Sequence, residues 1–415
     1  MRKGKIFVAL AALGAAFAAQ AEKITIWSWD PHYNVAIMKD AADIYQKTHP
    51  DVTFDIVDLA KADLEQKLQT MLASGMTKVL PDIVLVEDYN APKYLRAFPG
   101  AFAPLNGKID FTRFAKYKVD LMTVEGKTYG VPFDTGVTVW YYRQDLLQQA
   151  GYTDKDLQDI SWDKFIEIGK KVQEKTGKKM MAIDPNDAGL IRIMMQSAGR
   201  WYFDKDGKLD IANNPALKEA LETQVKLNAA GIVKPVIGWA EWVGAFNRGD
   251  VASVVTGVWA TGSIKAEPKQ SGLWRVAPIP ALSVKGATHA SNLGGSSWYV
   301  LESSPEKAQA IQFLNDIYVN NIDFYQQILQ KNGAMGSNLL SREGAAYKQP
   351  DPYFGNAPIW STFSDWLKVI PAVNYGMYTY EADAAVGAQL PALKDGAPVE
   401  QVLKNIEQQV NTQIQ

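Results

Sequence analysis

Two short segments of the sequence place aromatic and acidic side chains where predicted β-strands end. The first segment contributes Trp27, Trp29 and Asp30, and the second contributes Glu87 and Asp88. An indole packs against the C–H face of a sugar ring, while a carboxylate accepts hydrogen bonds from the hydroxyl groups of the ring. Each tryptophan taken alone is equally well explained by core packing. Aromatic and acidic residues together at a strand end favour a binding site for such a ligand.

The residue types that most catalytic sites require are scarce. The sequence has no cysteine, and its three histidines lie far apart, at His32, His49 and His289. It contains no G-x-S-x-G motif and no glycine motif for phosphate or dinucleotide binding. Two carboxylates among Glu87, Asp88 and Asp134 could cleave a glycosidic bond if they stood about 5–10 Å apart. Ligand hydrogen bonding explains them more simply, so we expect no catalysis, cofactor or metal, and we keep a carbohydrate-active hydrolase as an alternative.

The elements that carry these residues alternate between strand and helix. Strands are predicted from Ile24, over 52–56 and over 83–86, with amphipathic helices over 37–44 and 62–75 between them. This order is typical of parallel strands joined by right-handed crossovers. In such a sheet, ligands bind beyond the carboxyl ends of the strands, which is where the aromatic and acidic residues lie.

Further helices and strands follow toward the C-terminus. Helices are predicted to begin at Ser161, Asn214 and Ser304, whose side chains suit helix N-termini, and strands are predicted over 251–255 and 297–301. No internal repeat interrupts this series. A chain of 415 residues exceeds what one hydrophobic core usually serves, so we expect two lobes.

The first 21 residues have the composition of a secretory signal peptide. Basic residues precede an apolar run over 6–19, and the segment ends with Ala19-Gln20-Ala21. The run is too short to cross a membrane as a permanent helix. We expect cleavage before Glu22; a buried N-terminal helix is the less favoured alternative. Because there is no cysteine to carry a lipid, we expect a freely diffusing periplasmic protein.

Charge and aromatic content narrow the choice of partner. The formal net charge is −2, and it becomes more negative once the basic N-terminal segment is removed. A mildly acidic protein is a poor match for nucleic acid or an anionic membrane. The sequence contains 12 tryptophans and 18 tyrosines, several of them beside turn residues rather than inside apolar runs. Tryptophan favours a polar contact for its N–H, so such residues often line binding surfaces.

Several motifs resemble those of a known family. They are 126–132 (GKTYGVP), 140–151 (WYYRQDLLQQAG), 246–260 (FNRGDVASVVTGVWA) and 291–300 (SNLGGSSWYV). In this order the sequence resembles the carbohydrate-binding proteins of bacterial ABC importers, the extracellular solute-binding proteins related to maltose-binding protein. The resemblance covers essentially the whole chain after the N-terminal segment. The start at Trp27-Ser28-Trp29-Asp30 is similar to the branch that binds lactose or arabinose-type sugars.

This resemblance implies an α/β fold with two lobes, the type II periplasmic binding protein, in which each lobe has a mixed, doubly wound sheet and the ligand lies between the lobes. The expected lobes are 22–133 with 280–320 (N-terminal) and 134–279 with 321–415 (C-terminal). Crossing segments are expected near 131–133, in the proline-containing stretch 276–280, and near Asn320.

The resemblance also implies which residues line the cleft. In the family, the aromatic residue of a Gly-x-Trp-Ala segment lies against the sugar, and Trp259 matches that position; packing in the second-lobe core is the alternative. Asp134 would enter the cleft from the first crossing. Gly295 and Ser296 would bring backbone N–H groups close to a ligand, because glycine has no side chain. Further candidates are Trp239, Trp242, Arg200, Tyr375, Tyr378 and Tyr380.

The implied function is binding for transport. The lobes would close around a mono- or small oligosaccharide, with a disaccharide favoured, and the closed monomer would deliver it to the membrane permease of an ABC transporter. Another small solute, such as a polyamine, an amino acid or a metal ion, stays open as an alternative. A cation would need more carboxylates in the cleft and an oxyanion would need arginine, so the aromatic excess favours a sugar.

Overall fold

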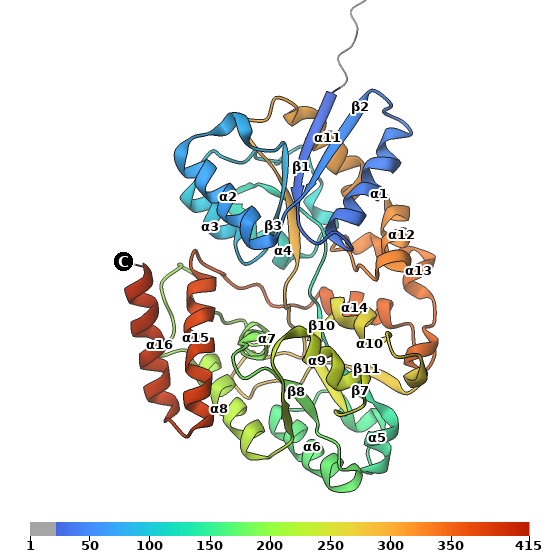
Figure 1. The fold of residues 1–415 in the computed structure, drawn as a ribbon, viewed down its shortest axis with the longest axis vertical. Helices are drawn as coiled ribbons and strands as arrows, with labels where there is room; N and C mark the ends of the chain where they lie inside the picture. Colours follow the sequence, from blue (N-terminus) through green and yellow to red (C-terminus); the bar gives the residue numbers. More distant parts are fainter. Residues whose placement is uncertain (1–21, 415) are drawn as a thin grey trace, which may run out of the picture.

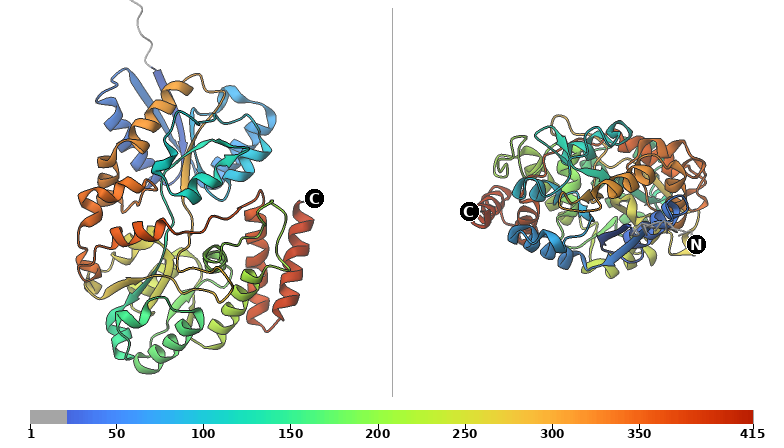
Figure 2. Two further views of the ribbon diagram at one scale, coloured as in Figure 1. Left: turned by 180° about the vertical axis from the view of Figure 1, so that it is seen from behind. Right: turned by 90° about the horizontal axis from the view of Figure 1, so that it is seen from above.

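The structure, a computed structural model, describes residues 22–414, which form two lobes stacked along the long axis of the molecule (Figure 1). The predicted signal peptide therefore lies outside the described residues. Extended segments carry the chain between the lobes near the middle of the molecule. The last two helices, α15 (Thr379–Lys394) and α16 (Val399–Ile414), stand together at one side of the second lobe (Figure 2).

The first lobe is built on a five-stranded sheet in the order β2-β1-β3-β12-β6. Its strands are β1 (Glu22–Ser28), β2 (Val52–Asp58), β3 (Ile83–Glu87), β6 (Gly130–Pro132) and β12 (Ser296–Val300). Strand β1 pairs parallel with β2 and β3, whereas β12 runs antiparallel to β3 and β6. Because β12 joins from a distant part of the sequence, the lobe contains separate stretches of chain.

Helices cover both faces of this sheet, since successive side chains of a strand point to opposite faces. On one face, Ile24 and Ile26 of β1 share a buried cluster with residues of α1 (Asn34–Gln46). On the other face, Trp27 is buried with residues of α2 (Lys61–Ser74). Alternate side chains of β1 are therefore buried against α1 or against α2.

The second lobe combines an antiparallel sheet in the order β10-β7-β11 with a parallel pair, β8-β9. The strands are β7 (Thr138–Arg143), β8 (Met181–Ile183), β9 (Val233–Pro235), β10 (Ser253–Gly257) and β11 (Trp274–Ala277). The N–H of Ser253 donates to the Met180 carbonyl at 2.8 Å, which connects β8 to β10. Both lobes are thus mixed α/β layers, as predicted.

Three crossing segments, 133–137, 291–296 and 334–338, lie side by side between the lobes. The N–H of Leu293 donates to the Gly136 carbonyl at 2.8 Å, and the N–H of Ser337 donates to the Phe133 carbonyl at 2.9 Å. A Cβ at Gly136 would stand 2.0 Å from the Leu293 carbonyl oxygen, so glycine is required at this position. The hinge is therefore a narrow, hydrogen-bonded bundle of backbone.

The second crossing was predicted too early in the sequence. The proline-containing stretch 276–280 stays in the second lobe, because Ala281 exchanges backbone hydrogen bonds with Ile160 and Trp162. The chain crosses only at 291–296. The prolines end β11 rather than marking the hinge.

The third crossing was also predicted too early. Helix α12 (Ile322–Asn332) belongs to the first lobe, since Phe324, Tyr325 and Ile328 are buried in the same cluster as Ile24. The chain leaves that lobe after α12. The predicted lobe boundary at 280 is therefore wrong by about one loop, and the predicted boundary at 320 is wrong by about one helix.

The remaining helices support the two sheets. Two predicted helix starts are confirmed, because the side chains of Ser161 and Asn214 accept hydrogen bonds from the first turns of their helices, whereas the helix predicted from Ser304 begins at Lys307. Within 22–414, no helix is long and apolar enough to cross a membrane. The other elements are α3 (Ala91–Ala97), α4 (Lys116–Leu121), β4 (Thr123–Val124), β5 (Lys127–Thr128), α5 (Gln144–Gln149), α6 (Trp162–Thr176), α7 (Gly189–Ser197), α8 (Pro215–Ala229), α9 (Gly238–Asn247), α10 (Thr261–Ile264), α11 (Lys307–Leu314), α13 (Ala345–Lys348) and α14 (Ile359–Leu367).

Candidate functional site

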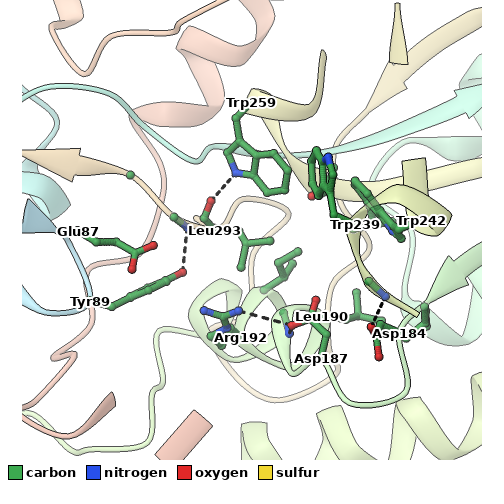
Figure 3. A pocket seen from close by; sticks show the side chains of 18 of the residues that line it. Glu87, Tyr89, Asp184, Asp187, Leu190, Arg192, Trp239, Trp242, Trp259 and Leu293 are labelled. Atoms are coloured by element: carbon green, nitrogen blue, oxygen red, sulfur yellow. Dashed lines mark hydrogen bonds and ion pairs between the residues drawn. The ribbon is translucent and has the colours of Figure 1, made fainter. Parts of the chain in front are cut away.

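A cavity of about 530 Å³ lies between the lobes, next to the crossing segments (Figure 3). Pockets for small molecules usually have volumes of about 300–1,000 Å³. Residues of both lobes line this cleft, and so do residues of the first two crossings. Eight predicted site residues lie in its lining: Trp29, Glu87, Asp134, Trp239, Trp242, Trp259, Gly295 and Ser296.

Three indoles form the second-lobe wall of the cleft, as Figure 3 shows. Trp259 follows β10 on a 3₁₀ turn, and Trp239 and Trp242 lie on α9. The ring centroid of Trp239 is 5.8 Å from that of Trp259 and 5.2 Å from that of Trp242, with interplanar angles of 39° and 37°. Tilted rings at these distances make a curved apolar wall. Such a wall can follow a ligand with more than one ring.

Trp259 is held in place by the crossing segment. Its Nε1–H donates to the Leu293 carbonyl at 2.8 Å. Gly257 allows this position, because a Cβ there would stand 2.2 Å from the indole nitrogen. The polar edge of the indole is therefore satisfied by protein, which leaves its face available to a ligand.

Polar groups at the end of β3 form part of the first-lobe wall. Glu87 ends this strand and pairs with Lys61, and Tyr89 lies two residues further along. The Tyr89 hydroxyl accepts a hydrogen bond from the N–H of Gly294 at 3.0 Å, and its ring stacks on Trp201 with centroids 5.5 Å apart. Burial raises the pKa of Tyr89 to about 12. The phenol is thus neutral and oriented at physiological pH.

Asp134 lies on the first crossing and lines the cleft although it is only 8% exposed. Its Oδ1 accepts the N–H of Ser296 at 2.7 Å, and its Oδ2 accepts the Tyr33 hydroxyl at 3.4 Å. Burial raises the pKa of Asp134 to about 6, and the buried Asp88 nearby acts in the same direction. This carboxyl therefore lines the cleft and connects two of the crossing segments.

The glycine pair before β12 brings backbone into the cleft. Gly294 and Gly295 have φ values of 88° and 99°, a region in which glycine is strongly favoured. A Cβ on Gly295 would stand 2.7 Å from the Asp88 carboxylate. The turn can therefore pass between that carboxylate and the cavity.

One arginine lines the floor of the cleft, on α7. The guanidinium of Arg192 lies 3.2 Å from the Asp383 carboxylate and 3.7 Å from that of Asp187, and it stands over the ring of Tyr89 at 5.2 Å. Its pKa is raised, because the nearby acids outweigh the effect of burial. Arg192 is a permanent cation whose charge is already balanced by protein.

Two of the predicted residues at the end of β1 do not line the cleft. Trp27 is 4% exposed and packs under α2, with Lys67 Nζ 4.2 Å from its ring centre. Asp30 is exposed with φ 63°, and its Oδ1 accepts the N–H groups of His32 and Tyr33 at 3.1 Å. The pleat of β1 turns Trp27 toward α2, and the turn before α1 uses the carboxylate of Asp30.

Five other predicted residues also lie outside the lining of the cleft, among them Tyr378 and Tyr380. Asp88 is fully buried and pairs with Lys118. Tyr375 is 1% exposed, and its hydroxyl donates to Gln196 at 2.9 Å. Arg200 is exposed in the loop after α7, outside the lining. Asp88 and Tyr375 support the residues that face the ligand, whereas Arg200 has no part in the site.

Several lining residues were not predicted from the sequence. Tyr89 had only a local signal, because it follows Glu87 by two positions but lies in the turn after β3 rather than in the strand. Arg192 and Tyr33 had none, since neither belongs to a recognised motif. Arg192 lies on α7 and Tyr33 in the turn before α1, and both reach the cleft through the packing of the fold. Asp184 and Asp187, in the loop before α7, were missed for the same reason.

The arrangement is suited to binding a polyhydroxylated molecule. Indole faces on one side stand opposite carboxylates, a phenol and backbone groups on the other, and both sides are needed to enclose a guest. Among residues 22–414, no group of three or more His, Asp or Glu side chains has the geometry to hold a metal ion. The lining offers hydrogen-bonding partners to a ligand.

The sequence matches a family described as bacterial extracellular solute-binding protein over residues 40–321. A lactose-binding protein of Rhizobium radiobacter is 60% identical over 405 residues, which is 98% of this chain and 96% of that protein. An arabinooligosaccharide-binding protein of Bacillus subtilis (strain 168) is 27% identical over 304 residues, which is 70% of this chain and 68% of that protein.

Solved structures share the fold. An extracellular solute-binding protein of family 1 superimposes with a TM-score of 0.80 at 21% identity, covering 94% of this chain and 99% of its own. The galacto-N-biose-/lacto-N-biose I-binding protein of Bifidobacterium longum superimposes with a TM-score of 0.77 at 20% identity, covering 95% and 97%. The predicted two-lobed fold and the predicted family are both confirmed. The chain belongs to the bacterial extracellular solute-binding proteins.

Proposed function

We propose that this protein binds a neutral disaccharide of the lactose type in the cleft between its lobes and delivers it to the permease of an ABC importer. One observation carries the proposal: three indoles of the second lobe face Glu87, Tyr89 and Asp134 of the first lobe and hinge across a cavity of about 530 Å³. The relative at 60% identity, which spans nearly the whole chain, is a lactose-binding protein.

The charge of the lining supports a neutral ligand. Four carboxylates and one guanidinium line the cleft, so an acidic sugar would be repelled. Arg192 is paired with two acids and offers little to an oxyanion. The carboxylates favour a cationic solute such as a polyamine as the second candidate, but Glu87 is paired with Lys61 and Asp134 accepts two hydrogen bonds. A ligand with hydroxyl groups fits this lining better than a cation does.

Closure of the lobes explains how affinity arises. Each lobe presents half of the polar and aromatic groups, so the ligand gains all contacts only when the lobes meet and thereby favours the closed state. A disaccharide has roughly 23 non-hydrogen atoms, and about −0.3 kcal/mol for each gives about −7 kcal/mol, near a micromolar Kd. Binding alone accounts for such a site, and we infer no catalytic step.

Location and assembly follow from the same role. We propose that the protein is exported through its N-terminal signal peptide, carries no lipid, and acts as a monomer in the periplasm. The absence of cysteine from the sequence supports the inference that no lipid is attached at the export site. Mass spectrometry of the exported protein should show a chain that begins at Glu22.

Isothermal titration with a panel of ligands tests the proposed function. We expect lactose to bind in the micromolar range or tighter, a uronic acid to bind more weakly, and spermidine not to bind. Lactose should also raise Tm, because it binds only the folded state. Stabilisation by spermidine alone would assign the cleft to a cation, and release of galactose or glucose during the titration would reveal a hydrolase.

A further inference from the structure

At one edge of the cleft, two lysines of the first lobe contact adjacent residues at the start of α15 in the second lobe. Lys61 Nζ lies 3.1 Å from the Tyr380 hydroxyl and 5.3 Å from the centre of its ring. Lys93 Nζ lies 3.0 Å from the Glu381 carboxylate. In the part of the chain from 22 to 414, this is the one ion pair that joins the lobes. Figure 1 shows α15 rising toward α2 and α3.

Lys61 differs from Lys93 because it also contacts a residue that lines the cleft. Its ammonium group pairs with the Glu87 Oε2 oxygen. A lysine carries three donors, so it can hold Glu87 and Tyr380 at the same time. Within the described residues, the second oxygen of Glu87 makes no hydrogen bond to protein, and it is available to a ligand hydroxyl.

We propose that Lys61 is a positioning residue that couples ligand binding at Glu87 to closure of the lobes, by holding Glu87 and Tyr380 together. The inference rests on the proposed function, since it concerns the same cleft. When the lobes separate, Tyr380 leaves with the second lobe and Lys61 keeps only its first-lobe partners. A ligand that fixes Glu87 therefore orients Lys61 toward Tyr380, and by linkage the contact with Tyr380 strengthens ligand binding.

The burial of these side chains makes the coupling effective. The side chains of Lys61 and Glu87 are 35% and 19% exposed, so water screens their pair less than a surface pair. Lys93 and Glu381 are similarly shielded, at 25% and 28%. The Lys93 pair stabilises closure but contacts nothing that faces the ligand, so it serves as a comparison.

A double-mutant cycle between Glu87 and Tyr380 tests the coupling, because the two residues share no hydrogen bond and meet only through Lys61. With lactose as the probe, Tyr380→Phe should weaken binding about 3- to 10-fold, the usual effect of losing one ordinary hydrogen bond, since Lys61 is partly exposed to water. In the Glu87→Gln background the same change should have a smaller effect, and in the Lys61→Met background it should have none. Lys61→Arg should retain most of the affinity that Lys61→Met loses. Equal effects of Tyr380→Phe in all backgrounds would refute the proposal.

The distance between the lobes gives a readout that needs no ligand. The chain has no cysteine, so spin labels can be placed on one introduced cysteine in each lobe. Without ligand, Lys61→Met, Tyr380→Phe and Lys93→Met should each shift the distances toward the open form. Lys307→Met, whose side chain is 34% exposed and pairs within the first lobe, should not.

The two measurements separate the inference from the proposed function. If the unaltered protein binds no sugar, the proposed function fails, while the interlobe distances still report whether Lys61 holds the lobes together. If the unaltered protein binds lactose but Tyr380→Phe changes neither affinity nor distance, the inference fails. Each variant is first checked by Tm, and the cycle uses only variants that fold.

Discussion

Replacing Trp259 with alanine should weaken sugar binding strongly while leaving the fold intact. A pyranose ring lying on an indole removes roughly 60 Å² from each surface, about 120 Å² in all, worth about 3 kcal/mol at 25 cal/mol per Å². Part of the ring surface is polar, so we expect between half of this value and all of it. The affinity should therefore fall about 10- to 100-fold.

The surroundings of Trp259 allow a finer comparison. Trp259→Phe keeps an aromatic face but removes the hydrogen bond to the Leu293 carbonyl, which orients the indole beside the hinge. A neutral hydrogen bond contributes about 1 kcal/mol, so this variant should lose about 5-fold in affinity. The phenylalanine variant should thus lie between the unaltered protein and the alanine variant.

Titration calorimetry with lactose measures both variants, and urea unfolding measures their stability. Trp366→Ala is the matched control, since Trp366 is half-buried on α14, with its ring 5.7 Å from that of Phe363, and lies outside the cleft. It should lower stability without changing affinity. If Trp259→Ala binds lactose as tightly as the unaltered protein, the indole does not contact the sugar and the assignment of this wall is wrong.

Three further predictions concern groups around the cleft. Trp27→Ala should lower the free energy of unfolding by about 3–5 kcal/mol and leave the lactose Kd unchanged, because Trp27 packs under α2; a changed Kd in a folded variant would return Trp27 to the site. Asp134 has a folded-state pKa of about 6, above its usual value. Between about pH 4 and pH 6, its carboxyl is therefore protonated in the folded protein and ionised in the unfolded chain. Its contribution to stability should fall as the pH rises from about 4 to about 6, by up to about 3 kcal/mol, and urea unfolding of Asp134→Asn should lack that slope. Gly295→Ala should lower Tm, because the alanine must adopt a φ of 99° with its Cβ 2.7 Å from Asp88, and an unchanged Tm would show that the turn rearranges freely.

The sequence located the cleft at the ends of β1 and β3, because parallel strands place their carboxyl ends at one edge of a sheet. It did not determine which side chains point into the cleft. Trp27 and Trp29 share a motif, yet Trp27 is still paired within β1 and packs under a helix, while Trp29 lies beyond the last paired residue. The motif alone does not show which of the two tryptophans lines the cleft, because that depends on where the backbone pairing of β1 with its neighbouring strands ends.

The hinge was the least predictable part of the fold. Its second and third segments, 291–296 and 334–338, are short extended stretches without periodicity, and they are recognised by hydrogen bonds to the first segment. The proline-containing stretch 276–280 had a stronger local pattern and was wrongly preferred. Arg192 was missed for a similar reason, because only the meeting of the lobes brings α7 to Tyr89.

Residues 87–89, at the end of β3, include side chains that line the cleft and a side chain that stabilises the structure behind it. Glu87 and Tyr89 line the cleft, whereas Asp88 points the other way and pairs with Lys118 in the core. The N–H of Asp88 still donates to the Gly295 carbonyl at 3.0 Å, so the alternation of the strand extends to this residue and turns its side chain away from that of Glu87. Asp88 also accepts the Ser297 hydroxyl at 3.1 Å, which ties β3 to β12 beside the hinge. Asp88 therefore holds in place the strand end that carries Glu87 into the cleft.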